Sequence, residues 1–382
     1  MSACIANASS QPSALTMAKE LTAGAKAATA RFGFITCTVG VDIEGLRNAL
    51  VAELADVPFV GVTSCQSVIG AGKVVKGPRA AAALWFCGDD VKASVAAHTV
   101  STPDDAIGRQ LARTAVAELG STPSFALFHG TPGTEEPLLR GLQSELRSIP
   151  LLGGSAADDA IAGQWSIFTS AGRFTAGAAV AVVRWPGKIA APWVAGSTAA
   201  PQKGIVTKAI GRTIHEIDGK PAAVVYNDWL NGALASSLAT EEQILSKTTL
   251  NPLGVIRTTG ITLVHPERFI GGKAIATFAE VYQGETVALV KSTSLAMQGR
   301  PANLVSRTIT EAGITHLKGV LLIYCAGCML AIDPATPAMV EALKGVTGNA
   351  PLAGSFNFGE QGCHTSGKPE HGNLMTGALL LG

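Results

Sequence analysis

The sequence has little charge and few aromatic side chains. Charged residues make up 15% of its 382 residues and aromatic residues 5%, whereas an average soluble domain has about 25% charged residues. The 29 basic and 28 acidic residues leave a net charge of +1, too small to hold a nucleic-acid backbone. The hydrophobic fraction of 47% excludes intrinsic disorder. We therefore expect a packed protein with no nucleic-acid partner.

Several sequence signals are also missing. No segment approaches the roughly 18 uninterrupted apolar residues of a membrane-spanning helix, so we expect no membrane partner. The N-terminus lacks the basic and apolar regions of a secretory signal, which predicts a cytoplasmic protein. Neither a Walker A loop nor a GxSxG elbow occurs, and GAGKVVKG, which begins at Gly70, indicates a hairpin turn.

The seven cysteines do not indicate a disulfide framework, because their number is odd and no export signal precedes them. Cys37 and Cys87 lie in apolar segments and are expected to be small core residues. Cys325 and Cys328 form a single CxxC motif. Structural zinc needs four ligands, and the segment at Cys363 and His364 could complete that set, so zinc is a weak alternative.

One pattern occurs three times along the chain. An apolar strand begins near Phe32, Ser124 and Gly319, and an amphipathic helix follows each of them. A short strand with proline and glycine comes next, and a long apolar strand closes each copy. A strand, a helix and a strand joined by short links make a βαβ crossover with parallel strands. A diverged fourth copy is expected between Lys203 and Thr293.

The repeats predict an α/β fold of βαβ units with long apolar strands, arranged as two similar-sized halves with mixed sheets. The polar segment GSTAAPQKG, near residue 200, is typical of a linker. We therefore expect one domain over residues 29–199 and a second over residues 200–382.

Ligands of such sheets bind outside the carboxyl ends of the strands. Arg257 is added as a candidate partner for a ligand carboxylate, because a guanidinium binds such groups bidentately. Asp158 has an alternative interpretation as a residue that caps a loop. The predicted ligand-binding residues are Thr63, Ser64, Cys65, Asp158, Arg257, Cys325, Cys328, Asn357 and Glu360.

These motifs resemble the FIST family, with its N-terminal and C-terminal domains in tandem from about residue 29 to the end. The resemblance rests on PFVGVTSCQSVIG, PLLGGSAADD, GIVTKAIGRTIHEIDGKPAAVVY, LLIYCAGCML and PLAGSFNFGEQG. It implies a cytoplasmic sensory module for small ligands, with amino acids as one class. Because the resemblance covers nearly the whole chain, we expect signalling through a separate partner. In the family an arginine often follows the Cys-Ala-Gly turn, where Cys328 stands here.

The resemblance also raises haem as an alternative cofactor, since some stand-alone family members are haem proteins that respond to nitric oxide and regulate a histidine kinase. Haem iron takes an axial histidine or cysteine. No CxxCH motif occurs, so covalent attachment is excluded. The candidate axial ligands are His129, His364 and His371.

A third alternative is a cysteine-dependent enzyme. Cys65 would be its nucleophile, with Glu360 or His364 as acid and base. This mechanism requires these groups to approach within hydrogen-bonding distance, which spacing along the chain does not establish. We expect a sensor of a small molecule rather than an enzyme.

Overall fold

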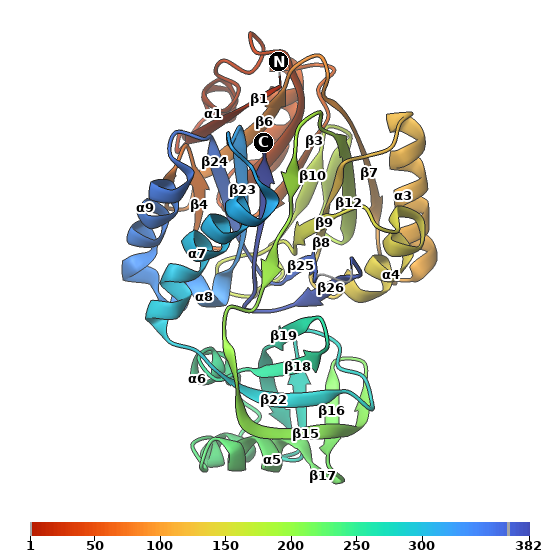
Figure 1. Ribbon diagram of the computed structural model, residues 1–382, viewed down its shortest axis with the longest axis vertical. Coiled ribbons are helices and arrows are strands. Elements are labelled where there is room, and N and C mark those ends of the chain that lie inside the picture. Colours follow the sequence, from red (N-terminus) through yellow and green to blue (C-terminus); the bar gives the residue numbers. More distant parts are fainter. Residues whose placement is uncertain (1, 365–366) are drawn as a thin grey trace.

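The chain folds into two bodies. The computed structural model describes residues 2–364 and 367–382. Figure 1 shows a large upper body, which contains both termini, and a smaller lower body beneath it. The chain enters the lower body with β15 (Thr198–Ile210) and leaves it with β22 (Thr286–Lys291). We call residues 198–291 the lower body, and the described residues before 195 and after 293 the upper body.

The three predicted βαβ units are present in the upper body. Strand β2 (Ala30–Cys37) runs parallel to β3 (Phe59–Thr63), and helix α2 (Ile43–Glu53) connects them. Strands β8 (Phe125–Gly130) and β9 (Leu151–Gly154) are parallel across α4 (Glu135–Leu146). The third unit pairs β23 (Gly319–Cys325) with β24 (Leu352–Asn357) across α8 (Ala326–Ala331), η2 (Asp333–Ala335) and α9 (Thr336–Thr347). The predicted mixed α/β fold class is confirmed.

Helix α2 illustrates why these segments form crossovers. Asp42 precedes the helix, and its carboxylate accepts a hydrogen bond from the Gly45 amide, which satisfies one open N–H at the helix start. Ile43, Leu46 and Leu50 are buried, at spacings of three and four residues. This spacing gives the helix one apolar face, which packs against the sheet.

The upper body contains three sheets. The first has the order β1 (Ala3–Ser9), β6 (Ala81–Cys87), β2, β3, β10 (Ile167–Thr169) and β11 (Gly172–Phe174). The second has the order β26 (Pro369–Gly372), β25 (Glu360–Cys363), β9, β8, β12 (Gly177–Arg184) and β7 (Lys92–Thr99). The third has the order β13 (Ile189–Ala190), β27 (Thr376–Leu381), β23, β24, β4 (Ser67–Gly70) and β5 (Lys73–Lys76), with β14 (Trp193–Val194) beside β27.

Segments from both ends of the chain share two of these sheets. Strand β24 pairs with β4, and β25 pairs with β9. The core between the sheets also draws side chains from all three, among them Phe34, Leu127 and Ile323. Helices α1 (Ala14–Leu21) and α3 (Asp105–Leu119) complete the N-terminal part. The hairpin predicted at GAGKVVKG is confirmed as the antiparallel pair β4 and β5, and Cys37 and Cys87 are fully buried at strand ends.

The prediction of a fourth βαβ copy between Lys203 and Thr293 is wrong. All strand pairs of the lower body are antiparallel within the described residues. Several of its strands are short apolar runs buried at consecutive positions, for example β21 and β22, so the run of apolar residues did not by itself distinguish antiparallel from parallel pairing. The strand order is β19 (Gly260–Val264), β18 (Leu253–Arg257), β22, β15, β16 (Thr213–Ile217), β21 (Ala274–Thr277) and β20 (Pro266–Ile270), with β17 (Lys220–Pro221) beside β16. The helical segments are α5 (Ala222–Trp229), η1 (Ala235–Leu238) and α6 (Leu245–Thr248).

Candidate functional site

The turns that follow the parallel strands meet at one place in the upper body. The Cys65 amide, just after β3, donates to the Phe356 carbonyl of β24 at 3.0 Å. The Ala157 amide, after β9, donates to the Thr63 carbonyl at 2.9 Å. Turns from all three βαβ units therefore lie side by side, on the side that faces the lower body (Figure 1).

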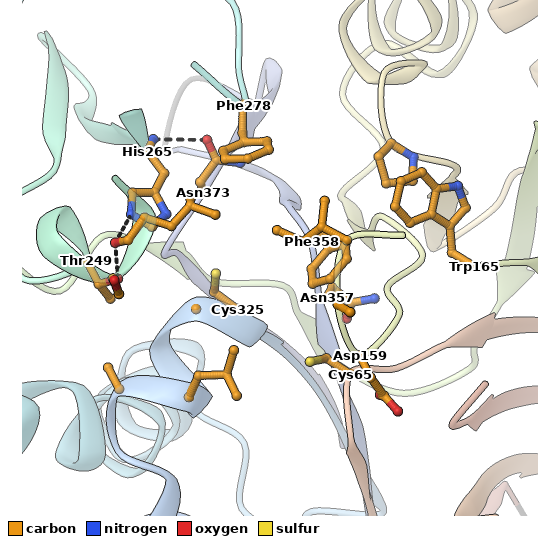
Figure 2. A pocket seen from close by; sticks show the side chains of 18 of the residues that line it. Cys65, Asp159, Trp165, Thr249, His265, Phe278, Cys325, Asn357, Phe358 and Asn373 are labelled. Atoms are coloured by element: carbon orange, nitrogen blue, oxygen red, sulfur yellow. Dashed lines mark hydrogen bonds between the residues drawn. The ribbon is translucent and has the colours of Figure 1, made fainter. Parts of the chain in front are cut away.

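A cavity of about 570 Å³ lies where the upper body meets the lower body. Figure 2 shows Phe358, Trp165, Phe278 and His265 around it, with Cys65 and Cys325 at its base. Its upper-body lining is Cys65, Pro132, Asp159, Ala160, Ile161, Trp165, Cys325, Gly327, Leu330, Ala331, Asn357, Phe358 and Asn373. Its lower-body lining is Arg212, Leu245, Ser246, Thr249, Leu250, His265 and Phe278.

Three of the predicted ligand-binding residues line this cavity: Cys65, Cys325 and Asn357. Five others are buried and do not line it: Thr63, Ser64, Asp158, Cys328 and Glu360. The Thr63 hydroxyl accepts a hydrogen bond from the Ser166 amide, and the Ser64 hydroxyl donates to the Ser67 carbonyl. These two hydroxyls therefore hold the turns together.

Asp158 shapes the loop that forms one wall of the cavity. Its carboxylate accepts hydrogen bonds from the amides of Ala160, Ala162 and Gln164, at 2.9 to 3.0 Å. The neighbouring Asp159 lines the cavity and accepts from the Gln66 amide at 2.7 Å. The geometry thus favours the loop-capping interpretation of Asp158.

Arg257 lies outside the cavity lining. Its guanidinium donates to Glu285 at 2.5 Å and to Glu370 at 2.6 Å, so two carboxylates already occupy it. The cation that lines the cavity is Arg212, which is paired with Glu135 at 2.7 Å and Glu136 at 2.6 Å. Neither guanidinium is therefore free to bind a ligand carboxylate.

The environment of Cys65 does not activate a nucleophile. Burial, together with the negative charges of Asp159 and Asp158, raises the pKa of the Cys65 thiol to about 12. Glu360 is fully buried and lies outside the cavity lining, and the His364 ring contacts Thr262 and Trp193 instead. Cys65, Glu360 and His364 therefore do not form one catalytic site, as the enzyme alternative requires.

We expect Cys65 to react with iodoacetamide at pH 7.5 about a thousandfold more slowly than free cysteine. A pKa near 12 leaves that much less thiolate, and thiolate is the reactive form. The rate is measured by peptide mass spectrometry on the folded chain, with urea-unfolded chain as the control. A folded-state rate equal to that of free cysteine would contradict this assignment.

The three histidines proposed as haem ligands lie outside the cavity lining. His129 is fully buried in β8, where Nδ1 lies 2.8 Å from the Gly154 carbonyl, and burial lowers its pKa to about 4. His364 Nε2 lies 3.1 Å from the Thr262 hydroxyl. His371 lies between the Gln361 amide and the Phe278 carbonyl, at 2.9 and 3.2 Å.

His265 is a cavity residue that the sequence analysis missed. Burial lowers its pKa to about 4, so its ring is neutral near pH 7. Its Nε2 lies 3.1 Å from the Leu245 carbonyl, which can only accept, so Nε2 carries the hydrogen and Nδ1 keeps a lone pair. In Figure 2 the ring stands on the lower-body wall of the cavity. His265 therefore offers a neutral hydrogen-bond acceptor.

The cavity does not fit the haem alternative. Haem has two propionates, and the cation in the described lining, Arg212, is already neutralised by two glutamates. His265 presents Nδ1, the ring nitrogen beside the side-chain attachment, which is the more crowded one for iron. We derive no role for haem from this site.

The zinc alternative finds no support in the positions of the side chains. Across residues 2–364 and 367–382, no three side chains of the types that bind metals gather around a common point. The pair Cys325 and Cys328 therefore finds no third ligand in Cys363 or His364.

None of the helices in those same ranges combines the length and apolar character needed to cross a membrane.

Comparison with known proteins gives a family assignment. Residues 31–220 match the family model of the FIST N domain, and residues 222–363 match that of the FIST C domain. A search of curated proteins gave no match. Among solved structures, the chain is similar to cyanuric acid hydrolase from A. caulinodans, at 12% identity and a TM-score of 0.37, over 100% of this chain and 99% of that chain.

Some of the other cavity residues could have been identified from sequence, and others could not. Phe358 lies within PLAGSFNFGEQG, directly after Asn357, so a wider window around Asn357 would have included it. Asn373 lies eleven residues beyond that motif. Arg212 lies within GIVTKAIGRTIHEIDGKPAAVVY, but that motif gave no reason to place its side chain at the site. His265 and Phe278 also belong to the lower body and lie outside every motif quoted above. Their role depends on how the lower body packs against the upper body.

Proposed function

Since the chain belongs to the FIST family, whose domains sense small ligands in signal transduction, we propose that this protein is a sensor whose ligand binds in the cavity between its two bodies. The single observation that carries the proposal is that both bodies line one cavity of about 570 Å³. This volume is within the range of about 300–1,000 Å³ that is typical of small-molecule sites. The proposed ligand is a metabolite, and the proposed location is the cytoplasm.

The lining favours a neutral, flat ligand. Trp165, Phe278 and Phe358 provide aromatic surface for stacking. Asn373 provides a side-chain amide, and His265 provides the neutral acceptor. The Asn357 amide is engaged by Ser155 and Ser355. An amino acid is the weaker candidate, because its carboxylate would need a cation and Arg212 is already paired with two glutamates. A neutral heteroaromatic metabolite fits these groups best.

Binding would be relayed by the contact between the bodies. Several polar contacts join them, including the Arg212–Glu135 pair and the hydrogen bond from the His265 amide to the Asn373 side chain at 3.1 Å. A ligand that touches both walls stabilises the arrangement that brings them together, and so shifts the population of that arrangement. A separate signalling protein, such as a histidine kinase, would recognise this arrangement.

A thermal-shift panel tests the proposed ligand class. The panel contains neutral nucleobases and pteridines, the α-amino acids, and haemin. We expect the neutral heteroaromatic set to contain a compound that raises the melting temperature, because a ligand at about 100 times its Kd stabilises the folded chain by about 2.7 kcal/mol. A response to amino acids alone, or a shifted and sharpened Soret band relative to free haemin, would contradict the proposed class.

A further inference from the structure

Cys325 and Cys328 form a buried pair of thiols at the base of the cavity. Cys325 ends β23 and lines the cavity, whereas Cys328 is fully buried three residues later in α8. Residues three apart at a helix start have Cβ atoms about 5–6 Å apart. A disulfide needs its Cβ atoms about 3.5–4.5 Å apart, so the start of α8 must adjust by about 1–2 Å to close the bond. The two thiols already share a hydrogen bond. One thiol is thus accessible from the cavity, and its neighbour lies behind it.

A buried arginine lies against the second thiol. Arg300 of α7 (Ser294–Ala312) is 4% exposed, and its Nη1 lies 4.0 Å from the Cys328 sulfur. The same guanidinium donates to the Leu374 carbonyl at 2.6 Å and to the Ser197 hydroxyl at 3.1 Å. In the part of the chain that the structure describes, no carboxylate forms an ion pair with Arg300.

A buried cation without a counter-charge is costly, so an anion is expected beside Arg300. Burial and the neighbouring Cys325 thiol raise the pKa of Glu360 well above the usual value, which disfavours its carboxylate as that anion. Burial also disfavours a thiolate on Cys328, but a hydrogen bond from the Cys325 thiol and the charge of Arg300 outweigh it and lower the Cys328 pKa. The Cys328 sulfur thus lies 4.0 Å from the Arg300 guanidinium, which favours its thiolate form.

We propose that Cys325 and Cys328 are a redox-active dithiol, which a small organic disulfide entering the cavity oxidises to an intramolecular disulfide. Burial raises the pKa of the Cys325 thiol well above its usual value, so Cys325 attacks only in the fraction of molecules in which its proton has passed to the Cys328 sulfur. The Cys325 thiolate then attacks the small disulfide RSSR, which forms a mixed disulfide and releases RS⁻. The Cys328 thiol gives its proton to this RS⁻, and its sulfur attacks the Cys325 sulfur and expels a second RS⁻. The dithiol loses two electrons, and RSSR gains them.

The experiment incubates the full chain, folded, with cystamine and cysteamine in varied ratio, traps free thiols by alkylation, and maps the peptides by mass spectrometry. We expect a disulfide between Cys325 and Cys328 in the wild type and in Cys65→Ser. Cys328→Ser and Cys328→Ala lack both the acceptor for the Cys325 proton and the resolving sulfur, so oxidation should be slower and should stop at cysteamine attached to Cys325. A pair that reacts only after unfolding in urea, or a bond between Cys65 and Cys325, would overturn the proposal.

The role of Arg300 is tested separately through reaction rates. In Arg300→Gln, loss of the positive charge should raise the pKa of the Cys328 thiol. Alkylation of Cys325 and Cys328 at pH 7 should then slow by about tenfold for each unit by which that pKa rises. Arg300→Lys keeps the positive charge and should retain most of the rate. If Arg300→Gln reacted as fast as the wild type while remaining folded, the sulfur would not be the counter-charge of the arginine.

Discussion

Replacing Arg212 by methionine is expected to lower the free energy of unfolding by about 3–5 kcal/mol, because it leaves a buried carboxylate without its partner. Glu135 is 1% exposed, and its oxygens accept from Arg212 at 2.7 Å, from the Ser155 hydroxyl at 2.6 Å and from the Gly133 amide at 2.8 Å. Arg212 belongs to the lower body and Glu135 to the upper body. The loss should therefore also loosen the contact that closes the cavity.

The matched control is Arg268→Met. Arg268 belongs to the same lower body and pairs with Glu267, but its side chain is 44% exposed. An exposed pair contributes about 0–1 kcal/mol, so this variant should change little. Adding Glu135→Gln to Arg212→Met removes the unpaired charge and should recover much of the loss. Urea unfolding of the four proteins measures these differences. Equal effects of Arg212→Met and Arg268→Met would contradict the assignment.

The stability that Arg212 contributes should decrease as the pH falls. Burial alone would raise the pKa of Glu135, but the charges of Arg212 and His371 and the hydrogen bond from Ser155 lower it to about 2. A glutamate with a depressed folded-state pKa contributes stability above its unfolded pKa of about 4.5, and loses it as the pH falls towards 2. The difference between wild type and Arg212→Met should therefore be largest near pH 7 and shrink below about pH 4.5.

Replacing Gly327 by leucine is expected to weaken ligand binding at least about 100-fold, or about 2.8 kcal/mol. Gly327 lines the cavity from α8. A Cβ there would lie 3.0 Å from Leu374 Cδ2, 3.6 Å from Cys325 Sγ and 3.9 Å from His265 Cε1. The first of these contacts is with the end of a flexible side chain, which can move. The remaining leucine atoms would occupy cavity volume.

Gly345→Leu provides the matched control, because Gly345 lies in a helix, α9, and a Cβ at this position would have no heavy atom within 4 Å among the described residues around it. Both changes replace a helical glycine with a better helix former, worth up to about 1 kcal/mol, so both chains should fold. Binding of Nile red, a neutral flat dye, is followed by its fluorescence. We expect Gly345→Leu to bind like the wild type and Gly327→Leu to lose the signal. Undiminished binding by Gly327→Leu would place the site elsewhere.

The predicted ligand-binding residues that line the cavity lie at the ends of parallel strands. Cys65 follows β3, and Cys325 and Asn357 end β23 and β24. Because β23 and β24 run parallel in register, Cys325 and Asn357 come to the same edge. Local periodicity sufficed to predict these crossovers, and the crossovers suffice to bring the strand ends together.

Other predicted residues lie outside the cavity lining, because their positions depend on side-chain direction and on partners remote in sequence. Glu360 lies three residues after Asn357, yet it starts β25 on the second sheet and turns into the core. Sequence predicted that the Arg257 guanidinium binds a ligand carboxylate. In the structure it forms ion pairs with Glu285 and Glu370, which are distant from it in sequence. No local pattern reports which carboxylates will surround an arginine after folding.

The amino-acid order alone determined the three βαβ units, the apolar strands and the turns that carry the thiols, since each depends on neighbours within a few dozen residues. Tertiary structure decided that strands from both ends of the chain share sheets, and that residues 198–291 form an antiparallel body against the upper one. It also decided that Arg212 and His265 face the cavity, and that Arg300 lies against Cys328. These outcomes come from packing between surfaces remote along the chain, where burial and charge balance act only once the fold has brought them together.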